Sequence, residues 1–501
     1  MKKILFYYAS CFGTEFLGEL MDEAKKYQED SSNDVVFYTC GGVNNYCMFN
    51  RYGSSAACKW CKYCTHKVLK HYNIEHKELK RVKSNDTKEL YDFSNADQLR
   101  SKEYRGVKIG LSIMSSYISL TRNMSPLINA KTKPYFDSLI RQSASFVDAF
   151  YDVVDNESPD VIYSYNGRFQ EYRPIYDIGI IKGVQTLMIE DYIKNSNGKK
   201  YKVAFENSLP HNIKELARRI KFCWDNYDLS QEEKQILGES FYKKRRNGEE
   251  AGDVAYTANQ KKDSIPDFKT DKINVAIMNS SEDEYAAVGD DWDTLKMFPT
   301  QYESIVYLLK NSPKNIHYYL RIHPNLSKVH YKYHTRLLDL PKEFNNITVI
   351  PATSEMSTYS ILDHVDKVVG FGSTMCIESS FWGKPSILMG PAIFSYEDTC
   401  YVPSTPEEAI KMIADESLKP ISNDFIVKFG AYFLNQDPVV IDSDIQYKYI
   451  NFNYHINKFI INYTSAPYIN FWGGEKLTSL IINSIRFILN KHSDSIPREE
   501  E

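Results

Sequence analysis

The most chemically suggestive segment of this 501-residue chain is Arg321-Ile322-His323-Pro324. It follows Ile316–Leu320, an apolar run typical of a buried strand, and Pro324 ends that strand because proline cannot donate to a ladder. An arginine and a histidine at the carboxyl end of a parallel strand lie where open α/β sheets bind ligands. We therefore predict that Arg321, His323 and Pro324 hold a phosphate. The alternative is a histidine in a turn beside a salt-bridged arginine.

A second segment, Val368–Glu378, reads as a strand that ends in Gly-x-Gly and is followed by two hydroxyl residues that can cap a helix. Glycine lets a ligand approach the backbone closely, and the free N–H groups of a first helical turn favour an anion. Glu378 is four residues beyond Thr374, so it shares that helix face and could accept hydrogen bonds from ribose hydroxyls. We predict that Gly372, Ser373, Thr374 and Glu378 bind the same donor; an ordinary capped turn is the alternative.

A third segment, Ser280–Glu284, follows another apolar run, Ile273–Met278. In a parallel sheet, the loops that follow neighbouring strands meet at the same edge. Hydroxyl and carboxylate groups in such a loop can form hydrogen bonds with a nucleotide or a sugar. We therefore predict that Ser281 and Glu284 complete the donor site.

Two strand ends in the amino-terminal half carry candidates for acid–base catalysis. Arg168 follows Val161–Tyr165 and an Asn-Gly turn pair, and Glu190 and Asp191 end the next apolar run, Val184–Ile189. A carboxylate at this edge could be the general base that deprotonates an acceptor hydroxyl. We predict catalytic roles for Glu190, Asp191 and Arg168, with a surface salt bridge as the alternative.

Five of the nine cysteines fall in one short stretch, and three of them form Cys58-x-x-Cys61-x-x-Cys64. In a reducing compartment, clustered thiols more often bind metal or act in redox than form stable disulfides. We predict a structural zinc on these three thiols, with Cys40 as the fourth ligand and Cys47 or His66 as the other candidates. Reduced, partly buried thiols without a metal are the alternative, because the standard pair of Cys-x-x-Cys motifs is absent.

The charge balance and the hydropathy restrict the class of protein. Lysine and arginine total 61 and aspartate and glutamate total 65, so the formal net charge is −4. This balance argues against a nucleic-acid partner. The amino-terminal apolar run is too short for a signal peptide, and no apolar stretch is long enough to span a membrane. We expect a cytoplasmic protein that could touch the inner face of the membrane through Lys243–Arg246, although a solvated helix face is the simpler interpretation.

Short apolar runs alternate with amphipathic segments along most of the chain, which is the pattern of a parallel α/β sheet. The polar stretch Tyr242–Lys272 separates two such series and is interpreted as an inter-domain linker or a long surface excursion. We predict an α/β protein with two facing Rossmann-like domains, residues 1–265 and 266–421. Residues 422–501 would form an extension that packs back on them, with a closing helix at Lys476–Lys491. The predicted strands are Ile4–Tyr8, Val35–Tyr38, Val107–Ile113, Val161–Tyr165, Val184–Ile189, Ile273–Met278, His317–Ile322, Ile347–Ile350, Lys367–Phe371 and Ser386–Met389.

The three carboxyl-terminal motifs, together with Gly383-Lys384-Pro385, resemble bacterial capsular and surface-polysaccharide biosynthesis transferases. The resemblance covers roughly Val161–Pro391, since the Asn166–Arg168 and Glu190 segments are also similar to that group. His-Pro followed by a Ser-Thr pair is similar to bacterial transferases that use CMP-activated sialic acid or Kdo. The resemblance implies the GT-B fold and a CMP-type donor held by His323, Ser373 and Thr374.

The resemblance implies a glycosyltransferase that moves a sugar from a nucleotide-activated donor to a surface polysaccharide or a lipid-linked glycan. We expect inversion at the anomeric carbon and no catalytic cofactor, because cationic side chains and a helix start would stabilise the leaving phosphate. Glu378 matches the ribose-binding glutamate of the fold. Two features depart from the family: the cysteine-rich stretch has no counterpart, and Glu190-Asp191-Tyr192 replaces the acidic base motif of the sialyltransferases.

Three other functions fit the same residues. A transferase of polyol phosphate from CDP-glycerol or CDP-ribitol resembles the chain in its His-Pro element. A UDP-sugar 2-epimerase would share the two-domain fold and need no acceptor. A non-enzymatic metal–thiol scaffold in a glycan assembly complex would use the cysteine cluster.

Overall fold

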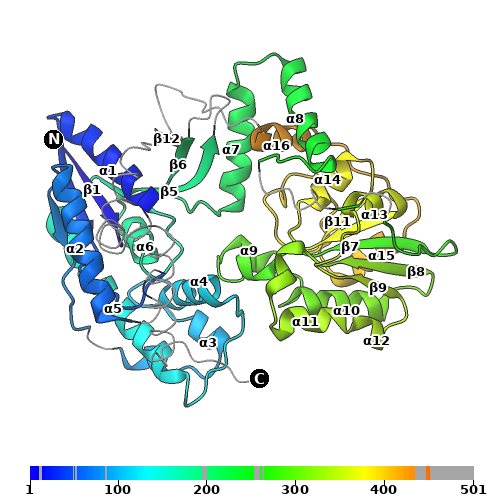
Figure 1. Cartoon of the computed structure of the whole chain (residues 1–501), viewed down its shortest axis with the longest axis horizontal. Coiled ribbons are helices and arrows are strands. Elements are labelled where there is room, and N and C mark those ends of the chain that lie inside the picture. The colour runs from blue at the N-terminus through cyan, green and yellow to red at the C-terminus, as the bar shows by residue number, and fades with distance from the viewer. Residues whose placement is uncertain are drawn as a thin grey trace, which may run out of the picture. The chain divides into compact units, whose positions relative to one another are not determined.

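The computed structural model describes residues 1–10, 14–48, 50, 53–84, 87–194, 200–252, 260–261, 264–434 and 447–451. The chain forms two compact units (Figure 1). Of the described residues, unit 1 holds those up to Pro210 and residues 447–451, and unit 2 holds those from His211 to Leu434. Each unit is built on a largely parallel sheet flanked by helices, so the predicted α/β class with two sheet-based units is confirmed.

The sheet of unit 1 has the strand order β12-β6-β5-β4-β1-β2-β3. The five strands from β5 to β3 run parallel, while β6 is antiparallel to β5 and β12 is antiparallel to β6. The strands are β1 Lys2–Tyr8, β2 Asn33–Thr39, β3 His76–Glu78, β4 Val161–Tyr165, β5 Gln185–Lys194, β6 Lys200–Glu206 and β12 Tyr447–Asn451. The helices are α1 Thr14–Glu29, α2 Ser55–His71, α3 Ala96–Arg100, α4 Ile109–Thr121, α5 Lys133–Glu157, α6 Arg173–Ile181 and the 3-10 helix η1 Lys88–Tyr91.

The core of unit 1 is aromatic on both faces of β1. Phe6 stacks with Phe37 on β2 and with Tyr163 on β4, whereas Tyr7 makes edge contacts with Phe146 and other rings on the opposite face. Successive strand residues point to opposite faces, so a strand buried on both sides reads as a continuous apolar run. Helix α5 supplies Phe146 and therefore covers the Tyr7 face.

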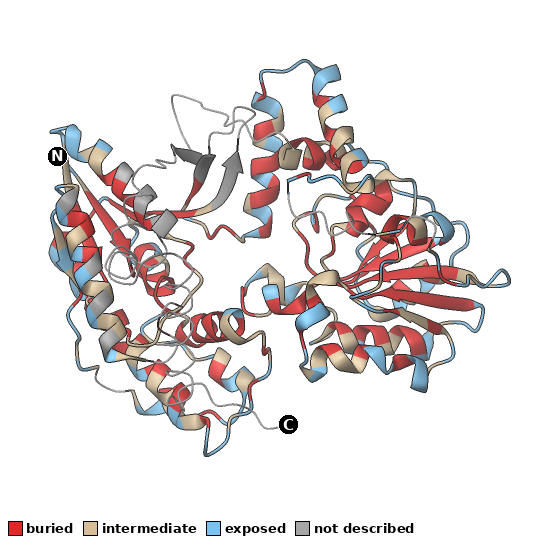
Figure 2. Ribbon diagram, in the orientation of Figure 1, coloured by how far each residue is buried: buried red, intermediate tan, exposed pale blue. Residues whose placement is uncertain are grey.

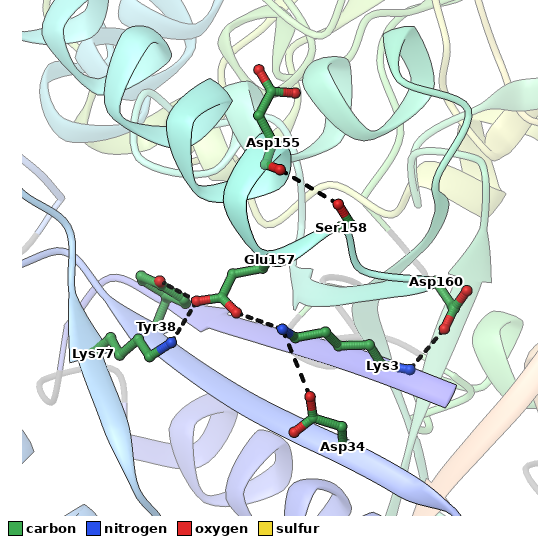
Figure 3. A network of polar contacts seen from close by, with 8 residues as sticks. All are labelled: Lys3, Asp34, Tyr38, Lys77, Asp155, Glu157, Ser158 and Asp160. Carbon is green, nitrogen blue, oxygen red and sulfur yellow. Dashed lines mark hydrogen bonds and ion pairs between the residues drawn. The ribbon is translucent and has the colours of Figure 1, made fainter. Parts of the chain in front are cut away.

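A buried carboxylate closes the end of α5 against the sheet (Figure 3). Glu157 receives hydrogen bonds from Lys77 on β3 at 2.6 Å and from Tyr38 on β2 at 2.7 Å, and it pairs with Lys3 on β1 at 2.7 Å. Burial by itself would raise the pKa of Glu157, but the bonds from Lys3, Lys77 and Tyr38 outweigh it and lower the pKa to about 2. This network joins three strands to one helix end.

Unit 2 contains a five-stranded parallel sheet with the order β11-β10-β7-β8-β9. The strands are β7 Ile273–Met278, β8 Ile316–Arg321, β9 Ile347–Ile350, β10 Lys367–Gly370 and β11 Ser386–Leu388. The helices are α7 Ile213–Asn226, α8 Gln231–Arg246, α9 Asp291–Thr294, α10 Gln301–Asn311, α11 Lys332–Leu338, α12 Leu340–Glu343, α13 Thr358–His364, α14 Met375–Phe381, α15 Pro406–Ala414 and α16 Asp424–Leu434, with 3-10 helices η2 Glu282–Glu284 and η3 Pro324–Lys328.

Alternation along β7 separates two cores. Val275 and Ile277 pack in one cluster with residues of α10, α11, α12 and α15, whereas Ala276 and Met278 pack with residues of α13. Helices therefore cover both faces of this sheet, and β8, β10 and β11 are buried along their whole length (Figure 2). A sheet of this kind leaves its carboxyl-terminal edge as the place for a ligand.

The division between the units falls at Pro210, whereas the sequence analysis placed a domain boundary at residues 265/266. Helices α7 and α8 belong to unit 2 because they share a core with α14 and α16, in which Tyr242 is fully buried and donates to the carbonyl of Ile426 at 2.5 Å. Residues 242–246 are thus the last turns of α8, and the prediction of a linker beginning at Tyr242 was wrong there.

One predicted strand was also wrong. Val107–Ile113 leads into α4, which is buried on all sides from Ile109 to Ile118. A short apolar run does not distinguish a buried strand from a buried helix. Gly110 permits α4 to pack closely against α3, since a Cβ there would lie 1.9 Å from the carbonyl oxygen of Leu99. The closing helix predicted at Lys476–Lys491 lies outside the described residues.

Candidate functional site

The carboxyl ends of β7 and β8 in unit 2 are joined by two asparagines. The backbone N–H of His323 donates to Asn279 Oδ1 at 2.8 Å. Asn325 Nδ2 donates to Ser281 Oγ at 3.4 Å and to Glu284 Oε1. The structure therefore brings together three of the predicted donor residues, His323, Ser281 and Glu284, within one loop cluster.

The imidazole of His323 has a defined hydrogen-bonding state. Its Nδ1 accepts from the backbone N–H of Asn325 at 3.2 Å, and Pro324 begins the short 3-10 helix that makes this contact possible. A ring nitrogen that accepts carries no proton, so the proton of the neutral imidazole is on Nε2. An Nε2–H group is a hydrogen-bond donor of the kind that binds phosphate oxygens.

The Gly-x-Gly motif after β10 is shaped by its neighbours. Gly372 has φ +78°, and a Cβ there would lie 2.6 Å from the carbonyl oxygen of Pro391. A Cβ on Gly370 would lie 2.2 Å from Cys376 Sγ. Ser280 Oγ donates to the carbonyl of Phe371, so the loops after β7 and β10 are also joined. Both glycines are required by the close approach of the chain to itself.

Glu378 is fully buried, and two side chains bind it. Arg245, from the last turn of α8, donates through Nε to Glu378 Oε1 at 3.1 Å, and Tyr359 donates its hydroxyl to Oε2. Arg245 also reaches Thr374 Oγ1 at 3.5 Å. Ser373 is buried, and its Oγ accepts from the backbone N–H of Met375 at 3.3 Å. The ribose-binding role predicted for Glu378 therefore applies to a carboxylate that already has an arginine partner.

Arg321 lies apart from this cluster. Its guanidinium is buried and donates to the carbonyl of Pro351 at 2.5 Å and to that of Ser354 at 3.0 Å. Burial lowers the pKa of Arg321 to about 10. The arginine thus fastens the loop after β9, while His323, two residues later, joins the loop after β7.

The carboxyl ends of β4 and β5 in unit 1 bring the predicted catalytic segments together. Asn166 Nδ2 donates to Glu190 Oε2 at 2.9 Å, and the backbone N–H of Arg168 donates to Asn166 Oδ1 at 2.9 Å. Asn166 has φ +55°, the left-handed conformation that asparagine adopts more readily than most residues, as the Asn-Gly turn requires. The register of β5 against β6 shifts between Glu190 and Tyr192, so Asp191 is the extra residue of a bulge; its side chain lies outside the described part of the chain.

Four cysteines line one cavity of ≈ 30 Å³ at the carboxyl ends of β1 and β2: Cys40, Cys47, Cys58 and Cys61. Burial raises the pKa of Cys40 to about 11, although backbone N–H groups that bond its sulfur act in the opposite direction. Asn50 Nδ2 donates to Cys58 Sγ at 3.2 Å. The structure thus places Cys47 beside Cys40, Cys58 and Cys61, which are three of the four predicted zinc ligands.

The structural zinc on Cys58, Cys61, Cys64 and Cys40 stays a prediction. Among the described residues, no group of three or more histidine, cysteine, aspartate or glutamate side chains is arranged to hold a metal ion. The side chain of Cys64 lies outside those residues.

A fully buried carboxylate that the sequence analysis missed lies in unit 1. The backbone N–H of Met48 donates to Glu171 Oε1 at 3.1 Å, and Oε2 has no hydrogen-bond partner among the described residues. Burial raises the pKa of Glu171 to about 7, although its backbone hydrogen bonds lower it. The sequence analysis could not find this site, because Glu171 belongs to no recognisable motif and its hydrogen-bond partner Met48 lies far away in the sequence.

No protein-family model and no curated protein sequence matches the chain. Among solved structures, it is similar to the beta Kdo 2,4 transferase KpsC of Thermosulfurimonas dismutans, with a TM-score of 0.34 and 14% identity over 55% of this chain and 79% of that one. It is also similar to the UDP-GlcNAc 2-epimerase of Neisseria meningitidis, with a TM-score of 0.27 and 9% identity over 86% and 97% of the two chains. The glycosyltransferase SsfS6 of Streptomyces sp. SF2575 has a TM-score of 0.21 and 10% identity over 87% and 96%. At these values the likeness does not extend to chemistry, so function is argued from the side chains of this chain.

Within the described part of the chain, no helix has the length and the apolar character that crossing a bilayer requires.

Proposed function

We propose that the chain is a glycosyltransferase of the GT-B type that binds a nucleotide-activated sugar through unit 2. The observation that carries the proposal is the loop cluster at the carboxyl ends of β7 and β8, where hydrogen bonds join Asn279, Ser281, Glu284, His323 and Asn325. Polar side chains gathered at this edge of a parallel sheet are suited to a nucleotide. The resemblance to capsular transferases supports the sugar as the group that moves.

On this proposal, the Nε2–H of His323 donates to a phosphate oxygen of the donor. The hydroxyls of Ser373 and Thr374 follow β10, which pairs with β7, and would bind the same phosphate or the ribose. Hydrogen-bond donor groups of the protein that are held in place before the reaction stabilise the charge that develops on the leaving phosphate. Arg245 balances the negative charge of Glu378, so that this carboxylate does not repel the phosphate.

The acceptor hydroxyl would attack the anomeric carbon as the bond from that carbon to the phosphate oxygen breaks. Glu190 would take the hydroxyl proton, and Asn166 would hold its carboxylate in position through the 2.9 Å hydrogen bond. Attack in line with the leaving group would invert the anomeric configuration. Arg168, whose backbone orients Asn166, would position the base rather than contact the reacting atoms.

A thermal-shift screen of the full chain against CMP, CDP, UDP, GDP and ADP tests the proposal first. A ligand that binds the native state raises the midpoint of unfolding by mass action. His323→Ala should weaken binding of the preferred nucleotide about tenfold or more, because one charge-assisted hydrogen bond is lost. Arg321→Lys is a matched control, since its side chain fastens a different loop. If no nucleotide shifts the midpoint, the proposal fails.

The nucleotide that binds separates the candidate donors. Preference for CMP would favour a donor of the sialic acid or Kdo type. Preference for CDP would favour the transfer of a polyol phosphate, which is then tested by following the phosphate. Preference for UDP would call for incubation with UDP-N-acetylglucosamine alone, since conversion without an acceptor identifies a 2-epimerase.

A further inference from the structure

Unit 1 contains a second concave site, at the carboxyl ends of β2 and β3. The segment after β2 contributes Asn45, the segment after β3 contributes Arg81–Ser84, and one face of α5 closes the site. The cavity has a volume of ≈ 710 Å³. Pockets for small ligands span about 300–1,000 Å³, so a monosaccharide with a charged substituent fits.

The lining of this basic pocket is unbalanced in charge. Arg81, Lys83 and Arg141 line it, and none of its described lining residues is an aspartate or a glutamate. Neither Lys83 nor Arg141 forms a hydrogen bond or an ion pair through its side chain with another described residue. By contrast, Lys62, another cation of unit 1, has an acidic partner in Glu78 at 2.7 Å. Three cations around one cavity, with no acidic side chain among the residues described there, favour an anionic ligand.

The walls of the pocket are fixed by hydrogen bonds. Gln142 Oε1, on α5, accepts from the backbone N–H groups of Asn45 at 2.7 Å and Tyr46 at 3.1 Å. Ser145 Oγ, one turn further along α5, accepts from the N–H of Val82 at 3.2 Å and donates to its carbonyl at 2.6 Å. Side chains three and four residues apart share a helix face, so α5 presents Arg141 on the surface that holds both loops.

Hydrogen bonds also fix the guanidinium of Arg81 at the pocket. Its Nη2 donates to the carbonyls of Gly42 at 3.2 Å and Val43 at 3.3 Å and to Asn45 Oδ1 at 3.3 Å. All three partners are uncharged, so the positive charge of the guanidinium is oriented but not neutralised.

We propose that this basic pocket binds an anionic group, a phosphate or a carboxylate, on the acceptor glycan. Arg81, Lys83 and Arg141 would bind the anion, and neutral groups such as Asn45, Ser138 and Thr87 would face sugar hydroxyls. The assignment to the acceptor rests on the proposed function, whereas the anion site rests on the pocket alone. A glycan built from acidic or phosphorylated sugars is therefore the substrate class.

Saturation-transfer NMR with the full chain tests the site, using glucose 6-phosphate, glucuronic acid and glucose as probes. The double variant Lys83→Ala/Arg141→Ala is compared with Lys59→Ala/Lys131→Ala, which removes the same total charge from exposed lysines of unit 1 that do not line the pocket. We expect one of the two anions to bind more tightly than glucose. That preference should fall roughly tenfold or more in the pocket variant, because charge-assisted hydrogen bonds are lost, and should persist in the control.

The outcomes separate the sources of the anion and the two proposals. Preference for glucose 6-phosphate or for glucuronic acid identifies a phosphate-bearing or a carboxylate-bearing acceptor. Equal loss in both double variants would mean that surface charge in general binds the probe and would overturn the pocket, as would no signal from either anion. Loss in His323→Ala but not in the pocket variant would show that the probe enters the donor site, and this also overturns it. The nucleotide screen is independent, so either proposal can fail alone.

Discussion

Two glutamates, one in each unit, are both fully buried and have opposite surroundings. Glu378 in unit 2 is bound by Arg245 and by the hydroxyl of Tyr359. Glu171 in unit 1 accepts a hydrogen bond from the backbone N–H of Met48, and its second oxygen has no partner among the described residues. A buried charge is tolerated when it is paired and costly when it is not. The charge of Glu378 is therefore compensated within unit 2, whereas Glu171 in unit 1 keeps one carboxylate oxygen without a hydrogen-bond partner among the described residues.

The largest expected effect would place proton chemistry in unit 1. In Glu190→Gln, the side-chain oxygen can still accept the hydrogen bond from Asn166, but the amide cannot take a proton. Turnover should therefore fall by about 10²–10⁴. Nucleotide affinity should stay unchanged, since the donor residues are in unit 2. Steady-state kinetics with the nucleotide sugar that the screen selects measures the first quantity, and calorimetric titration measures the second. An equal loss in both would argue against a base.

The second prediction tests how far the buried Glu378 depends on its partner Arg245. Arg245→Met removes the cation that pairs with Glu378, and a buried carboxylate without its partner should cost about 3 kcal/mol of unfolding free energy. The double variant Arg245→Met/Glu378→Gln removes both charges and should recover most of that loss. Urea unfolding of both variants measures the difference. Equal destabilisation by the single and double variants would mean that lost packing, not lost charge pairing, is responsible.

The third effect concerns the unsatisfied glutamate and has the opposite sign. Burial raises the folded-state pKa of Glu171 to about 7 from its ordinary value of 4.5. The folded state therefore binds this proton more tightly, and stability falls as the pH rises from about 4.5 through about 7. Glu171→Gln should raise the unfolding free energy at pH 8 by about 1–3 kcal/mol and change it little at pH 4. Urea unfolding at the two pH values tests this; a loss at pH 8 would show that the ionised carboxylate has a partner.

The smallest expected effect compares Glu171 with Glu157, another buried carboxylate of unit 1. Glu157 has three side-chain partners, and its pKa is lowered to about 2 (Figure 3). Its stabilising contribution is present above the unfolded pKa and is lost as the pH falls from about 4.5 towards about 2. Glu157→Gln should lower stability by about 1–2 kcal/mol at pH 7, and this difference should shrink below pH 4. Thermal unfolding at both pH values measures it, and a constant difference would exclude the charge as its origin.

Much of the fold could be predicted because buried parallel strands are continuous apolar runs. Ile273–Met278 and Val161–Tyr165 were predicted with the bounds that the structure has. The short strand β3 and the polar strand β6, Lys200–Glu206, were missed, since neither contains such a run. Val107–Ile113 was misread because a helix buried on every side has no polar face to reveal its period.

The candidate site divides in the same way. The positions of His323, Ser281 and Glu284 at strand ends follow from local sequence, so their proximity could be expected. The partner of Glu378 could not, because Arg245 is 133 residues away and lies in a basic run that reads as a solvated helix face. Arg321 shows the converse: its type and place favour a ligand, but the carbonyls it binds come from a loop that no motif identifies.

The packing of α8 on α16 has a consequence for dissecting the protein. A fragment that starts in the polar segment after Arg246 would contain every strand of the unit 2 sheet and would look like a complete Rossmann-like domain. It would lack Arg245 and Tyr242, which bind Glu378 and the carbonyl of Ile426. Such a fragment would have a buried acid without its cation and an uncovered apolar helix. The smallest piece that can be studied alone therefore begins before α7, at His211.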